Sequence, residues 1–417
     1  MTAMTSPAIP TVESAAPIVL DPAGAHSHDE DKHLRAKGTA ARVDVLGVTA
    51  WSVTDPTVLK SLLMSPDVSK NPRAHWPDFK EVVQTWPLAL WVAVENMLTA
   101  YGDDHRRLRR MIAPIFSRPR VAALGEYIDT VVDSLLDDLE RLDDGAPVDL
   151  REHLAYPLPI AVIGRLLGVP ADQRPAFRAI VDGVFDTTRT AEEATANQKD
   201  LYRALHALVD SKTLHPGDDM TSLLISTRDD EGDGGTLTET ELVDTLVLMI
   251  SAGYETTVNV IDQAITQLLA DPAQLEHVRA GRVTWEDVVE ETLRVEPAVK
   301  NLPMRYAVKD IVLPDGTRIA KGDAILASYA AANRHPAWHG ETADTFDATR
   351  PSKDHLAFGH GVHFCLGAPL ARLEITTVLR RLFDRFPALT LAVPVNELEP
   401  LGSLISNGHR ELPVRLG

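Results

Sequence analysis

The sequence contains one cysteine, Cys365, and it lies in a stretch framed by three glycines. Gly359, Gly361 and Gly367 allow tight turns and leave backbone N–H groups uncovered, so these groups can point at the sulfur. A helix is expected to begin just after Gly367, with Pro369 in its first turn, and a cysteine at a helix N-terminus has a lowered pKa. A single thiolate cannot form a zinc or iron–sulfur site, but it can be the axial ligand of a haem. The ordinary alternative is a buried, unreactive cysteine.

A second candidate site lies in the longest helical pattern, which is expected over 238–270. Its centre carries Ala252, Gly253, Glu255 and Thr256 between apolar residues, although a glycine lowers helix stability by about 1 kcal/mol relative to alanine. The Thr256 hydroxyl can bond the carbonyl of Ala252, four residues back, and open the helix locally. An acid beside an alcohol at such a turn indicates proton delivery. The alternative is packing, with small residues for a close helix crossing.

Both stretches resemble motifs of one family. Phe358, Gly361, Cys365 and Gly367 have the spacing Phe-x-x-Gly-x-x-x-Cys-x-Gly, which is similar to the haem-ligand loop of the cytochrome P450 family. Residues 252–256 are similar to the family's Ala/Gly-Gly-x-Asp/Glu-Thr motif, which lies over the distal face of the haem. The order of the two motifs along the chain is that of the family.

The resemblance covers about residues 36–417. It implies a mostly α fold with a small β region, in which helices form a triangular prism around haem b. It also implies a monooxygenase that activates O₂ and hydroxylates an apolar C–H bond, with Cys365 as the iron ligand and with Glu255 and Thr256 managing protons. A peroxide-using member of the fold, or a haem-thiolate sensor or carrier, is the alternative. The acid–alcohol pair disfavours both.

Residues 104–120 carry six arginines and one acid in a chain whose net charge is −19. His105 and Arg109 are four residues apart and share one helix face. The resemblance implies that this pair, together with Arg305 and His363, holds the haem propionates. The other cofactor contacts that it implies are Ala252, Gly253, Phe358, Gly359 and Gly367.

The partner expectations combine charge with the resemblance. The net charge of −19 argues against nucleic acid as a partner. No apolar stretch is long enough to span a membrane, and one cysteine fits a reducing compartment, so a cytoplasmic protein is expected. The resemblance implies electrons from a separate ferredoxin or flavodoxin with its reductase. Arg106 and Arg110, on another helix face than His105, are expected to meet this acidic donor.

A structural ion-pair network behind the haem is also implied by the resemblance. Glu291 and Arg294 have the family's Glu-x-x-Arg spacing, which carries little weight alone because pairs three residues apart are common. Arg350 is the candidate that completes the network, and Arg334 is its competitor.

The resemblance places several apolar residues against substrate. The pocket segments lack charged clusters, so we expect a bulky and mainly apolar molecule such as a steroid, terpenoid or macrolide. The predicted substrate contacts are Trp91, Val92, Met97, Leu98, Leu248, Met249, Val299, Leu302, Leu404 and Ile405.

The remaining patterns predict the frame that positions these residues. Residues 1–35 lack helical or strand periodicity and are expected to be a mobile tail, followed by a single domain over 36–417. The other predicted elements are a hairpin over 42–53, helices over 55–63, 122–142 and 154–167, two helices over 171–209 joined by a lid near 187–197, a flexible acidic loop over 228–235, a helix from Cys365 to about 386, and strands and turns over 389–417.

Overall fold

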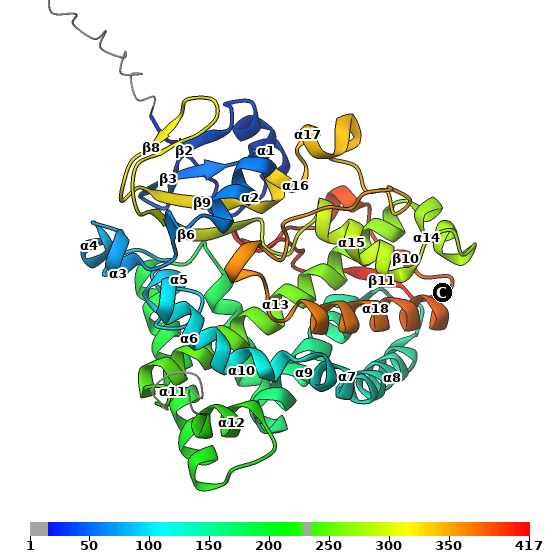
Figure 1. Ribbon diagram of the computed structural model, residues 1–417. Coiled ribbons are helices and arrows are strands. Elements are labelled where there is room, and N and C mark those ends of the chain that lie inside the picture. The colour runs from blue at the N-terminus through cyan, green and yellow to red at the C-terminus, as the bar shows by residue number, and fades with distance from the viewer. Residues whose placement is uncertain (1–15, 228–234) are drawn as a thin grey trace, which may run out of the picture.

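The computed structural model describes residues 16–227 and 235–417. Its β region is a six-stranded sheet in the order β1-β2-β3-β9-β6-β4 (Figure 1), in which β1 runs parallel to β2 and β3 parallel to β9. The strands of this sheet are β1 (Ile18–Val19), β2 (Ala40–Val45), β3 (Val48–Val53), β4 (Val68–Ser69), β6 (Asn301–Ala307) and β9 (Ala324–Ser328). Smaller sheets contain β5 (Val148–Asp149), β10 (Thr390–Leu391) and β11 (Pro413–Arg415), and β7 (Ile311–Val312) with β8 (Arg318–Ile319).

The predicted hairpin is confirmed, because β2 and β3 pair antiparallel around Leu46 and Gly47. Both turn residues have positive φ, 55° and 90°, as a tight two-residue hairpin requires.

Helices form most of the rest, so the predicted fold class, mostly α with a small β region, is confirmed. They are α1 (Ser27–Arg35), α2 (Pro56–Met64), α3 (Pro72–His75), α4 (Phe79–Val82), α5 (Leu90–Ala93), α6 (Gly102–Ile112), α7 (Arg118–Ala123), α8 (Gly125–Leu142), α9 (Pro157–Leu167), α10 (Arg174–Phe185), α11 (Ala191–Leu214), α12 (Met220–Ser226), α13 (Glu239–Ala270), α14 (Pro272–Arg279), α15 (Trp285–Val295), α16 (Tyr329–Asn333), α17 (Pro336–His339) and α18 (Ala368–Arg385). Short 3-10 or π turns are η1 (Ala113–Phe116), η2 (Arg151–Ala155), η3 (Ala171–Gln173), η4 (Gly340–Thr342), η5 (Gly361–His363) and η6 (Val395–Glu397).

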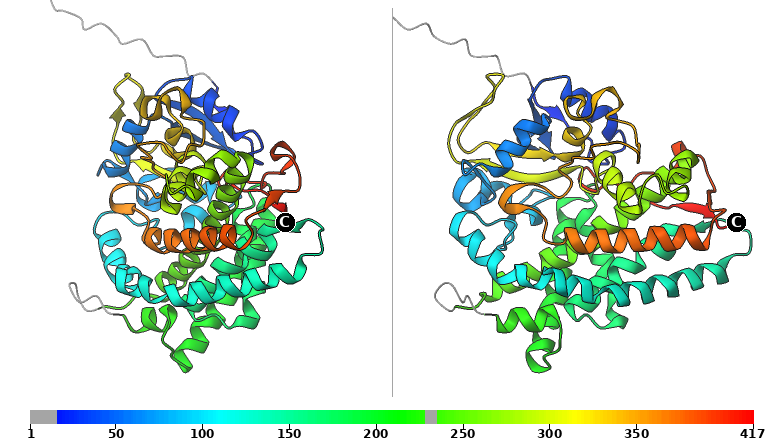
Figure 2. Two further views of the ribbon diagram at one scale, coloured as in Figure 1. Left: turned by 90° about the vertical axis from the view of Figure 1, so that its right-hand side faces the viewer. Right: turned by 45° about the vertical axis from the view of Figure 1, so that its right-hand side comes forward.

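The long helix α13 runs through the middle of the helical region (Figures 1 and 2). It begins at a capping box, since the Thr238 side chain accepts from the Glu241 N–H and the Glu241 side chain accepts from the Thr238 N–H. It contacts α9, α10, α11, α15 and α18. A helix surrounded in this way can present one face to an internal site while the others are held by packing.

The expectation of a mobile tail is wrong for the part of residues 1–35 that the structure describes. Strand β1 joins the sheet, with Ile18 opposite Val43, and α1 packs against α16. Asp31 of α1 is 4% exposed and pairs with Arg334, which is 1% exposed. The N-terminal segment is therefore part of the packed structure from β1 onward. Residues 1–15 lie outside the described residues.

The joint between the two helices predicted over 171–209 spans Asp186 to Thr190 in the structure, between α10 and α11. Thr190 caps α11 with a second capping box, which explains why the joint is shorter than predicted. Of the predicted acidic loop over 228–235, residues 228–234 lie outside the described residues.

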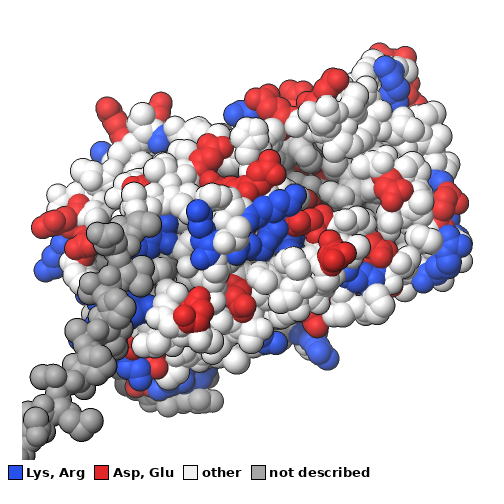
Figure 3. Space-filling model, turned by 90° about the horizontal axis from the view of Figure 1, so that it is seen from above, with Lys and Arg blue, Asp and Glu red and all other residues white. Residues whose placement is uncertain are grey.

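The surface of the protein carries both basic and acidic side chains. On the face seen from above, Lys and Arg side chains gather near the middle and Asp and Glu side chains border them (Figure 3), so opposite charges lie close together there. Within the described ranges, no helix combines the length and the apolar composition needed to cross a membrane.

Candidate haem-thiolate site

The cysteine loop turns sharply between Phe358 and the start of α18. Gly361 has φ +71°, and a Cβ atom at this position would lie 2.8 Å from the carbonyl oxygen of Leu63 in α2. Only glycine fits there without displacing backbone. The Cys365 N–H donates to the Phe358 carbonyl across 2.9 Å. The backbone of the loop, closed on itself and pressed against α2, therefore sets the position of the sulfur.

Cys365 faces an internal cavity, which explains why its side chain is accessible although it lies deep in the protein. Burial raises the pKa of the Cys365 thiol, while the N–H groups of Gly367 and Ala368 and the charge of Arg109 oppose this rise. The expected lowering of the pKa is wrong in this structure, because desolvation of the thiolate outweighs the nearby donors. Of the glycine N–H groups predicted to point at the sulfur, that of Gly367 does so, whereas that of Gly359 donates to the Leu356 carbonyl across 2.8 Å.

The middle of α13 forms the opposite wall of the cavity, where Ala252, Gly253 and Thr256 line it. The predicted hydrogen bond is confirmed, because the Thr256 hydroxyl donates to the Ala252 carbonyl across 2.7 Å. The expected local opening is not found, since the segment stays α-helical throughout. A Cβ atom on Gly253 would lie 2.8 Å from Cδ1 of Ile163 in α9, so this glycine also permits a close helix crossing.

Three of the four side chains predicted to hold propionates line one end of the cavity, namely His105, Arg109 and His363. The rings of the two histidines have centroids 4.1 Å apart. Burial, reinforced by the charge of Arg109, lowers the pKa of His105 to about 4. Burial also lowers the pKa of His363 well below its usual range. Both imidazoles are therefore neutral at pH 7, and each keeps one N–H that can donate.

Arg305, the fourth predicted residue, lies behind His363 and donates to the Tyr329 hydroxyl across 3.4 Å. Lys70, which was not predicted, is 3% exposed and donates to the Pro303 carbonyl across 3.1 Å. Burial, with a contribution from Arg305, lowers the pKa of Lys70 well below its usual range. The positive charge near His363 therefore comes mainly from Arg109 and Arg305.

Two polar atoms of this basic cluster are buried without a hydrogen-bond partner among the described residues, Nε2 of His105 and Nη1 of Arg305. A buried group left unsatisfied costs about 1–3 kcal/mol, so such donors favour an anionic ligand. Haem propionates would supply such anions, and Cys365 would supply the iron ligand. Elsewhere in the described chain, no three His, Cys, Asp or Glu side chains cluster to hold a metal. The site therefore fits a haem-thiolate cofactor, with Phe358, Gly359 and Gly367 also at the cavity wall.

Glu255, predicted to act beside Thr256, is turned away from the cavity. It is 3% exposed and is absent from the described cavity lining. Arg151 of η2 donates to Glu255 Oε1 across 3.2 Å and to Asp262 Oδ2 across 2.8 Å, and Asn259 donates to the same Glu255 oxygen across 3.1 Å. Burial raises the pKa of Glu255 to about 7, although Arg151 opposes this rise. Near neutral pH, both the acid and its carboxylate are populated.

Most of the predicted substrate residues surround the cavity: Trp91, Met97, Leu98, Leu248, Met249, Val299 and Leu302 line it. Val92, Leu404 and Ile405 are not part of the described lining, and they pack in the core. The Leu404 N–H donates to the Thr187 hydroxyl across 2.9 Å, which turns the final loop toward the α10–α11 joint.

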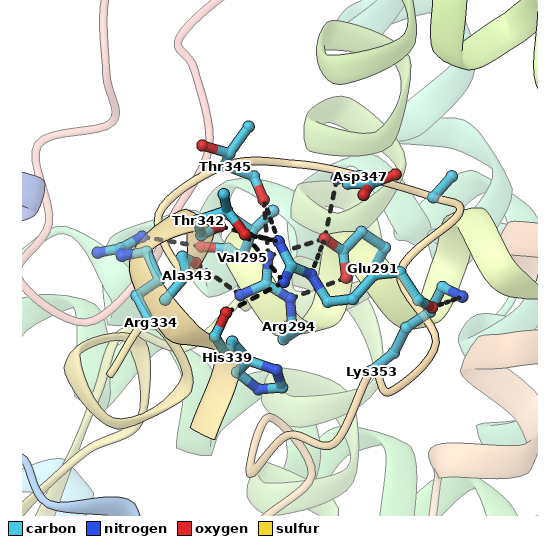
Figure 4. Close-up of polar contacts among 12 residues, drawn as sticks. Glu291, Arg294, Val295, Arg334, His339, Thr342, Ala343, Thr345, Asp347 and Lys353 are labelled. Carbon is cyan, nitrogen blue, oxygen red and sulfur yellow. Dashed lines mark hydrogen bonds and ion pairs between the residues drawn. The ribbon is translucent and has the colours of Figure 1, made fainter. Parts of the chain in front are cut away.

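The predicted ion-pair network is assembled around Glu291 (Figure 4). Arg294 donates to it through Nε and Nη2 across 2.8 and 2.7 Å, and Arg350 through Nε across 3.2 Å. The competing Arg334 pairs with Asp31 instead. Of the two candidates, Arg350 completes the network.

Among the polar residues at the cavity wall that sequence reasoning missed are Ser251 and Glu374. Both have a buried oxygen without a partner among the described residues. Burial raises the pKa of Glu374 to about 8, so this acid is neutral at pH 7. The sequence did contain a signal for Ser251, because this residue lies one turn before Glu255 in the polar centre of α13. An isolated acid in an amphipathic helix such as α18 gives no such signal.

The predicted docking arginines lie on α6, which contacts the cysteine loop. The Arg106 side chain is 67% exposed and pairs with Asp103, and Arg110 is half-buried. In the loop itself, Val362 is 61% exposed and Phe364 is 41% exposed. The surface near the cysteine loop thus combines basic and apolar side chains.

Comparison with known proteins agrees with this geometry. The cytochrome P450 family model matches residues 283–407, which include the Glu291 network and the cysteine loop. Among curated proteins, 2-hydroxy-5-methyl-1-naphthoate 7-hydroxylase of Streptomyces carzinostaticus is 42% identical, over 96% of this chain and 97% of that one. The monooxygenase PikC of Streptomyces venezuelae is 38% identical, over 92% and 89% of the two chains.

A solved structure shows the same architecture. CYP154A1 from Streptomyces coelicolor A3(2) superposes with a TM-score of 0.92 at 66% identity, covering 96% of this chain and 100% of that one.

Proposed function

Because this chain belongs to the cytochrome P450 family and is a monooxygenase of that family, we propose that it hydroxylates a C–H bond of a bulky, mainly apolar small molecule. The observation that carries this proposal is one cavity in which Cys365 faces Ala252 and Thr256 of α13, bordered by apolar side chains. A thiolate ligand, a hydroxyl and an apolar binding space then meet at one place.

We further propose that the cofactor is haem b. Bound there, haem supplies the activation of O₂, and a thiolate ligand favours cleavage of the O–O bond. Cys365 would hold the iron, and His105, Arg109, Arg305 and His363 would hold the propionates. The apolar wall orients the substrate and excludes water from the reacting carbon.

Thr256 and Glu255 have separate parts in proton delivery. The Thr256 hydroxyl proton is committed to the Ala252 carbonyl, so its oxygen is left free to accept a hydrogen bond from a group in the cavity. Glu255 holds an exchangeable proton near neutral pH and lies one residue away, behind the cavity wall. This pair disfavours both a peroxide-using enzyme, whose oxidant brings its own protons, and a sensor or carrier, which cleaves no O–O bond.

The substrate class rests on the lining and on the relatives' names. Trp91, Met97, Leu248, Met249 and Val299 offer a large apolar surface without an ion pair to hold a charged ligand. Relatives named for their substrates include hydroxylases of 6-deoxyerythronolide B and of vitamin D(3). A steroid, terpenoid or macrolide-like molecule fits both observations.

The electron source in this proposal is a separate ferredoxin or flavodoxin with its reductase. The surface that would receive it lies next to the cysteine loop, where the exposed arginine Arg106 and the apolar side chains of Val362 and Phe364 are found. Arg106 attracts an acidic donor, and the side chains of Val362 and Phe364 give the donor an apolar surface on which to pack.

The test is substrate turnover with a defined electron supply. The haem-loaded protein is mixed with a bacterial ferredoxin, its reductase and NADPH, and a small library of steroids, terpenoids and macrolactones is screened for products that contain isotopic oxygen from labelled O₂. Spectral shifts on adding each compound rank binding beforehand. The Cys365→Ser variant should lose both the thiolate-type spectrum of the reduced CO complex and the labelled product. Retention of that spectrum by the variant would refute Cys365 as the ligand.

A further inference from the structure

Thr256 is the hydroxyl expected to serve the cavity, but its proton is already used. It donates to the Ala252 carbonyl across 2.7 Å. Glu255 carries an exchangeable proton but does not reach the cavity, because Arg151 and Asn259 hold its Oε1 atom on the other side of the wall. A third group must therefore connect the acid to the cavity.

Ser251 has the properties that such a group requires. It lies one helical turn before Glu255, and residues four apart on a helix have Cβ atoms about 5–6 Å from each other. It lines the cavity, which Glu255 does not. Ser251 thus belongs to the cavity wall and lies one turn from the acid, and a side-chain rotation would turn its buried hydroxyl toward either of them.

The hydrogen-bonding state of both side chains points the same way. Ser251 Oγ and Glu255 Oε2 are both buried, and neither has a hydrogen-bond partner among the described residues. A serine in a helix commonly bonds the carbonyl four residues back, as Thr256 does, but Ser251 leaves the Val247 carbonyl alone. Two unsatisfied oxygens one turn apart favour a link between them, either direct after a side-chain rotation or through one water.

We infer that Ser251 relays protons from Glu255 into the cavity. This inference rests on the proposed function and adds a residue to it. In the step, the proton on Glu255 Oε2 passes to Ser251 Oγ while the Ser251 hydroxyl proton passes to the oxygen of a water molecule in the cavity. The Glu255 carboxylate that remains is stabilised by Arg151 until a proton from solvent water restores the acid.

The surroundings of Glu255 allow both of its charge states. Arg151 favours the carboxylate, whereas Asp182, Asp262 and burial favour the acid, so that the pKa of Glu255 rises to about 7. His409 donates to Asp262 across 2.8 Å and is partly exposed. Solvent therefore reaches a residue that contacts Asp262, which in turn accepts from Arg151. The relay can thus be recharged from outside without opening the cavity.

The experiment compares wild type with Ser251→Ala, Ser251→Thr and the control Thr245→Val. Thr245 has a buried hydroxyl without a partner on the same helix, but it lies outside the described cavity lining. For Ser251→Ala we expect turnover to fall at least about tenfold and the peroxide fraction to rise, which is less than the 10²–10⁴-fold of a complete acid–base loss because water can partly replace the hydroxyl. Ser251→Thr should restore turnover, and Thr245→Val should behave as wild type.

Two measurements separate the relay from other roles. Infrared difference spectra at pH 6, with Glu255→Gln to assign the band, should show the Glu255 carboxylic acid band shifting in Ser251→Ala, and the dissociation constant of a bound substrate should stay within about twofold. An unshifted band, or weaker substrate binding with unchanged coupling, would overturn the relay and leave Ser251 as a packing residue or a substrate contact. Absence of any labelled product from wild type would instead contradict the proposed function.

Discussion

The hydroxyl of Thr256 donates to the backbone carbonyl of Ala252 across 2.7 Å, at the wall that faces Cys365. The bond holds the hydroxyl in one orientation, so that its oxygen faces the cavity as an acceptor. Position and orientation at the wall, more than acidity, are therefore what Thr256 contributes to proton delivery.

For Thr256→Ala we expect NADPH consumption to continue while the fraction that ends in hydroxylated product falls several-fold. Electron uptake depends on the cysteine side of the cavity, whereas the lost hydroxyl lies on the opposite side. The measurement is the ratio of hydrogen peroxide to product. Thr266→Ala is the control, since this residue is 1% exposed on the same helix and outside the described cavity lining. A wild-type ratio in a well-folded Thr256→Ala protein would leave Thr256 a packing residue.

The double variant His105→Ala, Arg109→Ala should lose haem to an acceptor protein at least about tenfold faster than wild type. Hydrogen bonds to charged groups contribute about 1.5–3 kcal/mol each, and both side chains lie at the basic end of the cavity. The rate is followed by the absorbance of the acceptor. Arg106→Ala, on the same helix but 67% exposed, should keep the wild-type rate. An unchanged rate in the double variant would remove both residues from the propionate site.

Asp31→Ala should lower the free energy of unfolding by about 1.5–3 kcal/mol, because it removes a charged hydrogen-bond partner from the buried Arg334 guanidinium, which keeps only the more distant carboxylates of Glu296 at 3.6 Å and Asp344 at 3.8 Å. Urea denaturation of the haem-loaded protein measures this loss. Asp29→Ala, which removes an exposed acid from the same helix, should change the stability by less than about 0.5 kcal/mol. Equal losses of stability in the two variants would mean that the Asp31–Arg334 pair makes no specific contribution to stability.

Electron transfer from an acidic ferredoxin should slow as salt rises, because exposed charges are screened over about 8–10 Å at ordinary ionic strength. Arg106→Glu should reduce both the rate at low salt and its salt dependence. Arg141→Glu is the matched control, since Arg141 is also exposed and also pairs with an acid three residues before it, but lies on α8. The rate is measured by stopped-flow reduction under CO. Salt-independent transfer in wild type would rule out electrostatic docking at this surface.

Local chemistry explains why several features could be read from the chain alone. The capping box at Thr238 and Glu241 involves residues three apart, and the bond between Thr256 and Ala252 closes over one helical turn. The tight backbone at Gly361 is likewise encoded by the absence of a side chain. Such features depend on neighbours in sequence, so pattern and spacing predict them.

Other features were decided by contacts between segments far apart in the chain. Whether Arg350 or Arg334 pairs with Glu291 depended on where α1 packs, because Asp31 takes Arg334. Periodicity did not predict α1, since the apolar spacing in this short charged helix is weak. The burial of Leu404 and Ile405 depended on how the final loop packs in the core, where the Leu404 N–H donates to Thr187, more than two hundred residues earlier.

The chain by itself determined which residues could do chemistry here: one cysteine in a glycine-framed loop, and an acid beside an alcohol in a long helix. Only the tertiary structure decided the direction in which that acid points. Glu255 follows Arg151, a residue 104 positions earlier, and so turns away from the cavity that Thr256 faces. A side chain on a helix has several rotamers of similar energy, and a buried charge takes the one that brings it to an opposite charge.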